Sequence, residues 1–264
     1  MHELLSAALL GIVEGITEFL PISSTGHLIL AGNFLQFTGE EAKTFEVVIQ
    51  FAAILAVVQL YWPRFRGLLR RDPGAPFSGI RGLWLLFLTT LPAGLLGLFF
   101  YSPIKELLFA PLPVAIALTA GALGLLLVEH KRPAVRYQGL DELTWRIALG
   151  VGLFQCLSLW PGFSRAAATI MGAMFLGAGR TLAAEYSFFA AVPIVFAASA
   201  YDLYATREIL AGEHLPLLAT GFAVSFASAW IVIKAFLHFL HSHTLKPFAY
   251  YRLAVVALLV AFWT

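Results

Sequence analysis

The chain has 264 residues, of which 60% are hydrophobic and 12% are charged, and its mean hydropathy is +0.84. A soluble domain carries about twice that charged fraction, so the composition excludes a water-soluble globular protein. The formal net charge is only +2, and we expect membrane lipids and no nucleic acid as partners. The single cysteine, Cys156, excludes an internal disulfide bond.

Six apolar segments are long enough to cross a bilayer, which takes about 17–25 helical residues. They are residues 44–62, 83–101, 112–129, 184–204, 215–240 and 247–263. Two further segments, 4–36 and 147–178, are interrupted by FLPISSTG and LWPGFSRAA. Because irregular backbone at membrane depth must be buried in protein or line a wet cavity, both are predicted to be hairpins. We therefore expect an all-α integral membrane protein with six transmembrane helices plus two re-entrant helix–loop–helix hairpins.

Basic residues predict the orientation of this single membrane domain, residues 1–264. They cluster after the first, third and fifth spans, at Arg64, Arg66, Arg70, Arg71, Arg81, Lys131, Arg132, Arg136, Lys246 and Arg252. The positive-inside rule places these segments in the cytoplasm. Both termini and the mouth of the first hairpin then face outward, and the second hairpin enters from the cytoplasm.

The two halves are similar in sequence, residues 1–130 forming a first repeat and 146–264 a second, inverted one. At an offset of 140, Pro21 aligns with Pro161 and Ser24 with Ser164. Inverted repeats with interrupted helices usually bind ligands near the midplane, where the repeats meet. The two interrupted segments are therefore expected to meet.

The first interrupted segment combines acids with hydroxyl groups. Glu14 and Glu18 lie one helical turn apart, where like charges repel unless a cation, an arginine or a proton lies between them. The residues after Pro21 are candidate helix N-caps and a close-approach glycine, followed by a histidine in the first turn: Ser23, Ser24, Thr25, Gly26 and His27. A helix N-terminus of this kind favours an anion.

The second interrupted segment offers an arginine at an equivalent place. Ser164 is a candidate N-cap, Arg165 starts the next helix, and Thr169 lies one turn further on. A cation at a helix N-terminus is unfavourable for the helix alone. It is understandable if a bound anion lies within reach of the guanidinium.

Together these groups fit phosphoryl transfer. Arg165 and two helix N-termini would clamp oxygens, and Ser24 or His27 would act as nucleophile. The sequence leaves open whether Ser24 attacks with His27 as base, or His27 attacks with Ser24 as a positioning donor. Glu14 and Glu18 would hold Mg²⁺ or Ca²⁺, or move protons, since hard cations prefer oxygen ligands.

At these motifs the chain resembles the BacA-type undecaprenyl-diphosphate phosphatases. The family's E-x-x-x-E pair followed by F-L-P-x-S-S-T-G-H matches Glu14, Glu18 and residues 19–27. Its P-G-x-S-R-S-x-x-T motif matches 161–169, apart from Ala166, where the family usually has serine, and Ala167, where glycine is common. The resemblance extends over essentially the whole chain.

The resemblance implies a bacterial plasma (inner) membrane enzyme whose site opens to the outer, periplasmic face. It would hydrolyse a polyprenyl diphosphate lipid to undecaprenyl phosphate and phosphate, recycling the cell-wall lipid carrier, and would be associated with bacitracin resistance. Glu18, Ser24, His27 and Arg165 would be catalytic. Ser23, Thr25, Gly26, Ser164, Arg165 and Thr169 would bind substrate, and Glu14 and Glu18 would bind a divalent cation. A homodimer stays open, and a lipid-phosphate or anion transporter (flippase) on the same inverted-repeat scaffold is the alternative function.

Overall fold

The computed structural model describes residues 2–100, 104, 107–108, 110–131, 133–205 and 214–263. Within them the regular structure is helical and no strand is formed beyond an isolated bridge between Tyr137 and Ala178. The elements are α1 (His2–Thr17), α2 (Ser24–Phe34), α3 (Glu40–Leu60), α4 (Trp62–Gly67), α5 (Gly79–Phe99), α7 (Pro111–Lys131), η1 (Leu140–Glu142), α8 (Trp145–Gln155), η2 (Cys156–Leu159), α9 (Arg165–Phe175), α10 (Arg180–Ala205), α11 (Leu215–Leu240) and α12 (Lys246–Trp263).

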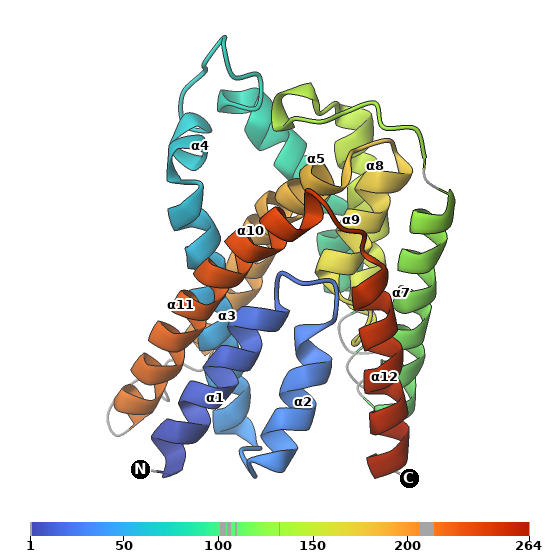
Figure 1. Cartoon of the computed structure of the whole chain (residues 1–264). Helices are drawn as coiled ribbons and strands as arrows, with labels where there is room; N and C mark the ends of the chain where they lie inside the picture. Colours follow the sequence, from blue (N-terminus) through green and yellow to red (C-terminus); the bar gives the residue numbers. More distant parts are fainter. Residues whose placement is uncertain are drawn as a thin grey trace.

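The bundle contains two helix–loop–helix hairpins. The first is α1–α2, and the second is α8–η2–α9. They enter the bundle from opposite ends, so that their loops meet near its middle (Figure 1). This is the arrangement that the two proline-containing interruptions predict.

Small residues let the first hairpin pack closely. A Cβ added to Gly11 would lie 2.8 Å from Gly221 O, and one added to Gly15 would lie 2.5 Å from Ser225 O. The backbones of α1 and α11 are therefore nearly in contact, as is common where small residues line a membrane helix pair. This contact fixes the depth at which α1 presents Glu14 and Glu18.

Five helices of the described residues are long and apolar enough to cross a membrane: Glu41–Leu60, Gly79–Phe99, Leu112–Lys131, Arg180–Asp202 and Leu215–Leu240. They coincide with five of the six predicted spans, although Tyr101, at the end of one, lies outside the described residues. The sixth, 247–263, coincides with α12, an 18-residue helix that is not among the five. An all-α, multi-pass membrane protein is thus confirmed at this level.

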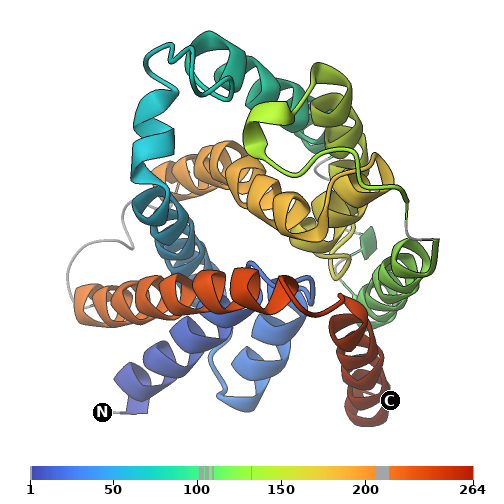
Figure 2. The same cartoon turned by 45° about the horizontal axis from the view of Figure 1, so that its top comes forward.

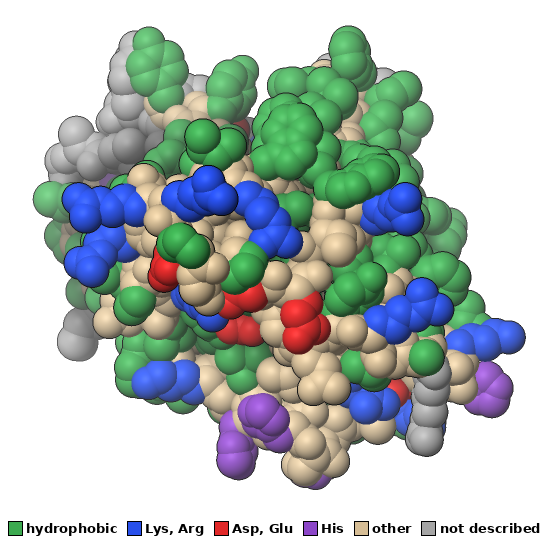
Figure 3. All heavy atoms as spheres, turned by 90° about the horizontal axis from the view of Figure 1, so that it is seen from above, with side chains coloured by type: hydrophobic (Ala, Val, Ile, Leu, Met, Phe, Trp, Pro, Cys, Tyr) green, Lys and Arg blue, Asp and Glu red, His purple; other side chains and the backbone are tan. Residues whose placement is uncertain are grey.

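The two termini lie at the same end of the bundle (Figure 1). Lysine and arginine side chains are scattered over the opposite end, with carboxylates between them (Figure 3). There Arg64 Nη1 lies 3.0 Å from Asp141 Oδ2. Arg132, also used to predict the orientation, lies outside the described residues.

Arg252 corrects the sequence interpretation. It was assigned to the basic, cytoplasmic set, but its side chain is completely buried in α12. Figure 2 shows α12 (dark red) beside α7 (green) at one edge of the bundle, and the two helices pack along their length. Arg252 points inward across this pair, and its four hydrogen bonds are made to backbone carbonyls.

Candidate active site

One carboxylate joins the two hairpin loops. Glu18 Oε2 accepts a hydrogen bond of 2.6 Å from Ser24 Oγ, and Glu18 Oε1 lies 2.8 Å from Arg165 Nη2. The side chains of Arg165 and Glu18 are only 11% and 6% exposed, so this ion pair is shielded from solvent. The predicted meeting of the interrupted segments therefore occurs at three of the predicted catalytic residues.

Serine caps place these residues. Ser23 caps α2 by accepting from Gly26 N at 3.4 Å, and Ser164 caps α9 by accepting from Ala167 N at 3.2 Å. Both serines have positive φ, 73° and 77°, a conformation that turns the chain sharply into the helix. Ser24 and Arg165 are consequently the first residues of their helices.

The caps also correct the repeat alignment. Ser164 was paired with Ser24, but its structural counterpart is Ser23. The second loop has one more residue between Pro161 and its cap than the first has after Pro21. Ser24 therefore corresponds to Arg165, so equivalent positions carry a hydroxyl in one hairpin and a guanidinium in the other.

A cavity of about 160 Å³ lies where the loops meet. Six predicted site residues line it: Glu18, Ser23, Ser24, Thr25, Ser164 and Arg165. Gln50, Ser158, Pro161, Gly162 and Val195 complete the wall. Since two helices begin at this wall, their unpaired N–H groups add positive potential to that of Arg165.

Arg165 is held by partners on two segments of the chain, and one nitrogen of its guanidinium is buried without a partner among the described residues. Its Nη1 donates to Ser187 O at 3.1 Å, while Nη2 engages Glu18. Its buried Nε has no hydrogen-bond partner among the described groups. A buried donor without a partner is costly, and an oxygen of a bound anion would satisfy it.

Thr169 and Ser187 form a layer behind Arg165. Thr169 Oγ1 lies 2.7 Å from Ser187 Oγ and 2.9 Å from the carbonyl oxygen of Arg165. Thr169 is completely buried and does not line the cavity, although the sequence predicted that it binds substrate. Gly26 also lies outside the cavity wall, where its amide serves the Ser23 cap.

Glu14 lies one turn before Glu18 and is 1% exposed. Neither of its carboxylate oxygens finds a hydrogen-bond partner among the described residues. It does not line the 160 Å³ cavity. The described residues contain no cluster of three or more His, Cys, Asp or Glu side chains that could hold a metal ion on their own.

His27 has both ring nitrogens engaged away from Ser24. Nδ1 lies 2.7 Å from Ser23 O, and because a carbonyl only accepts, Nδ1 carries the proton. Nε2 is then the acceptor for the Tyr251 hydroxyl at 2.8 Å. The hydroxyl of Ser24 donates its hydrogen bond to Glu18, so Glu18 is the base adjacent to Ser24 in this structure.

Residues that contact the site but were missed by the sequence analysis include Ser158 and Val195 of the cavity wall and also Ser187, Tyr251 and Arg252. Ser187 and Tyr251 are ordinary residues in apolar helices and give no sequence signal. Arg252 did give one, because a charged residue within a predicted span is functional by default. It was instead assigned to the orientation signal.

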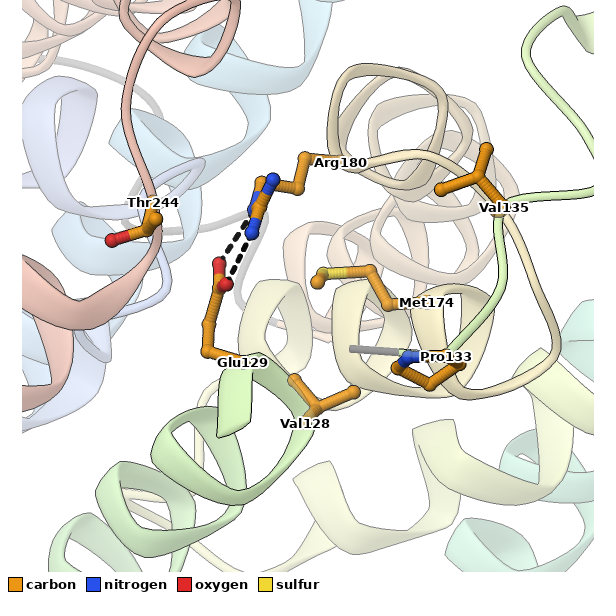
Figure 4. Close-up of a pocket in the computed structure, with 8 residues that line it drawn as sticks. Val128, Glu129, Pro133, Val135, Met174, Arg180 and Thr244 are labelled. Carbon is orange, nitrogen blue, oxygen red and sulfur yellow. Dashed lines mark hydrogen bonds and ion pairs between the residues drawn. The ribbon is translucent and has the colours of Figure 1, made fainter. Parts of the chain in front are cut away.

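A larger cavity of about 410 Å³ lies elsewhere, between the ends of α7 and α10 (Figure 4). Its charged side chains, Glu129 and Arg180, face each other and pair at 2.7 and 2.5 Å. Glu129 Oε1 also accepts from Leu245 N at 2.8 Å. The charges in this cavity therefore neutralise each other, whereas Glu18 in the loop cavity contacts both a hydroxyl and an arginine.

Comparison with known proteins decides the family. Residues 7–258 match the model described as bacitracin resistance protein BacA. The chain belongs to the BacA family. Its relatives include proteins named undecaprenyl-diphosphatase from Maridesulfovibrio salexigens (59% identity, 100% of both chains), Solidesulfovibrio magneticus (58%, 100% of this chain and 99% of the relative) and Nitratidesulfovibrio vulgaris (58%, 99% of both).

The BacA match spans both hairpins and continues into α12. It therefore includes the Glu18–Ser24–Arg165 contact and also the residues that sequence analysis missed. Since the relatives align with nearly the whole chain, the family assignment applies to the complete membrane bundle.

Proposed function

We propose that this BacA-family chain is an undecaprenyl-diphosphate phosphatase, which releases the terminal phosphate and recycles the cell-wall lipid carrier. The observation that carries the proposal is the single carboxylate, Glu18, that contacts both a hydroxyl nucleophile and an arginine. The family and its undecaprenyl-diphosphatase relatives agree with it. Association with bacitracin resistance follows from the same family.

Arg165 and the start of α9 bind the terminal phosphate in this mechanism. The guanidinium of Arg165, which lines the cavity, binds a phosphate oxygen, and the helix N-termini stabilise the negative charge. The cavity of about 160 Å³ accommodates a headgroup, so the polyprenyl tail stays in lipid. This arrangement explains why acids and hydroxyls lie at membrane depth.

Ser24 attacks the terminal phosphorus, and its proton passes to Glu18. The bond between that phosphorus and the bridging oxygen breaks, so undecaprenyl phosphate leaves with the bridging oxygen. Water then hydrolyses the phosphoserine, the proton returns to Ser24 Oγ, and inorganic phosphate is released. We choose Ser24 over His27 because Ser24 already donates to Glu18, whereas His27 is engaged by Ser23 and Tyr251.

A divalent cation, Mg²⁺ or Ca²⁺, accompanies the diphosphate in this proposal. Glu14 would be its protein ligand, because both oxygens are buried without a hydrogen-bond partner among the described residues. Glu18 would be the second carboxylate nearby. Carboxylate oxygens of this kind are the ligands that hard cations prefer. The cation would neutralise charge on the diphosphate.

Phosphate release from terminally ³²P-labelled undecaprenyl diphosphate tests the proposal. Purified protein in detergent is expected to release phosphate, to lose most of its rate with chelator, and to yield an acid-stable phosphoserine on quenching. An acid-labile label would assign the attack to His27. A folded protein that binds the lipid but releases no phosphate would contradict the enzyme and support the transporter alternative.

The proposed membrane arrangement has six spans, two re-entrant hairpins and a cavity open to the outer face of the bacterial plasma membrane. It is supported by the basic residues at the end opposite the termini. A reporter enzyme that is active only outside the cytoplasm is expected to be active when it is fused to either terminus. Inactive fusions would reverse the orientation and place the entrance of the first hairpin inside.

A further inference from the structure

Arg252 contacts both catalytic loops at once. Its Nη1 donates to Pro21 O at 3.1 Å in the first loop, and its Nη2 donates to Gly162 O at 3.1 Å in the second. The remaining bonds anchor it to α7, from Nε to Leu118 O at 3.0 Å and from Nη2 to Ala117 O at 3.2 Å. One guanidinium therefore joins three separate segments of the chain.

The planar guanidinium can donate hydrogen bonds to several carbonyls at once. Carbonyls in irregular buried loops need donors, because water does not reach them. Arginine presents five N–H groups in a fixed plane, whereas lysine concentrates three around one nitrogen. A lysine at position 252 could not reach all four carbonyls from their present positions, and burial would favour its neutral form.

The sequence also leaves room for this side chain. A Cβ added to Gly121 of α7 would overlap Arg252 Nη2 and would lie 3.0 Å from Phe163 O. Glycine is therefore required where the guanidinium crosses α7. The pair Gly121 and Arg252 behaves as one unit, since neither can be changed without affecting the other.

The charge of Arg252 is not neutralised by its bonding partners. All four acceptors are backbone carbonyls, and among the described residues no carboxylate lies within ion-pair distance of it. A buried charge is costly unless a counter-charge is supplied. The proline and glycine whose carbonyls it binds lie in the loops that begin α2 and α9, beside the cavity.

We propose that Arg252 is a positioning residue of the diphosphate site, resting on the function proposed above. Its guanidinium ties the Pro21 turn to the Gly162 turn, so that Ser24 and Arg165 face the same phosphate. Its uncompensated positive charge attracts the diphosphate together with Arg165. The alignment of Ser24 with Arg165 sets the turnover rate, and the positive charge of Arg252 contributes to the affinity for phosphate.

The test compares Arg252→Met, Arg252→Lys and Gly121→Ala with wild type in lipid nanodiscs. The measured quantities are kcat and the inhibition constant of inorganic phosphate. Arg252→Met and Arg252→Lys are both expected to lower kcat by about 10²-fold, the loss typical of a misplaced catalytic group. Arg252→Met and Arg252→Lys are both expected to weaken phosphate inhibition about tenfold, because a fully buried lysine favours its neutral form. Gly121→Ala keeps the charged guanidinium and is expected to weaken phosphate inhibition less.

Gly121→Ala keeps Arg252 but displaces its guanidinium, and is expected to reproduce the loss in kcat. Combining it with Arg252→Met is expected to add little further loss, since both changes break the same contact. Gly97→Ala is the matched control, because its added Cβ meets only Leu159 Cδ2 at 3.5 Å. If Arg252→Met fails to fold, Gly121→Ala and Arg252→Lys decide the question.

Two results would overturn the proposal. One is a kcat within about threefold of wild type in Arg252→Lys and Gly121→Ala. The other is phosphate inhibition in Arg252→Met that equals that of the wild type. The proposal would also be overturned if the variants lost activity only because less protein folded, so that activity per folded molecule stayed normal. Arg252 would then contribute to stability alone. An inactive wild type would instead refute the proposed function, so the two failures are distinguishable.

Discussion

Glu18→Gln is expected to lower kcat for phosphate release by about 10³-fold, within the range typical of removing a general base. The amide has nearly the same shape as the carboxylate but cannot take the proton from Ser24 Oγ, now 2.6 Å away. It also leaves Arg165 without its counter-charge, although the bond of Arg165 to Ser187 O persists. KM is expected to change much less than kcat, because the phosphate-binding donors stay in place.

The measurement is steady-state phosphate release by purified variants, normalised to folded protein. Glu41→Gln is the matched control, since it removes the same charge from a carboxylate that is 68% exposed at the start of α3. It is expected to retain wild-type kinetics. A Glu18→Gln variant with nearly normal kcat would show that Glu18 is only a structural partner of Arg165, and another base would have to activate Ser24.

Gly15→Ala is expected to lower the free energy of unfolding by about 1–3 kcal/mol, the usual cost of overpacking a tight contact. The added methyl carbon would lie 2.5 Å from Ser225 O and 2.8 Å from Ala229 N, and backbone atoms cannot move aside as a flexible side chain can. The helices α1 and α11 must separate. Because α1 carries Glu14 and Glu18, activity is expected to fall together with stability.

Thermal unfolding of the detergent-solubilised protein measures this effect. Gly94→Ala in α5 is the matched control, because an added Cβ there meets no atom within 4 Å. It is expected to be neutral or slightly stabilising, since alanine is the better helix former. Equal midpoints for Gly15→Ala, Gly94→Ala and wild type would show that the close approach of α1 and α11 does not limit stability.

Hydropathy and helix-breaking residues predicted most of the architecture. Five spans coincide with membrane-length helices, and both interruptions are loops that meet. These features were predictable because apolar length and the effect of proline are local properties. Local patterns carry no information on which distant backbone an arginine will contact, so Arg252 was assigned to the cytoplasmic end although it lies in the interior.

The alignment of the two loops could not be predicted from the sequence either. Ser23 and Ser24 are equally good caps by residue type, and only the three-dimensional turn distinguishes them. The structure gives the cap to Ser23 and leaves Ser24 facing Glu18. A loop that differs by one residue between repeats is enough to shift the correspondence from Ser164 to Arg165.

The left-handed backbone at Ser23 and Ser164 has a consequence for protein engineering. Such angles cost a non-glycine residue about 1–3 kcal/mol, and glycine adopts positive φ without that penalty. Replacing a capping serine by glycine loses only a few tenths of a kcal/mol. Selection for heat resistance alone would therefore replace these two serines early, although they direct the starts of α2 and α9. Laboratory evolution of a more thermostable variant would therefore need a screen for turnover at every round, so that these serines are kept.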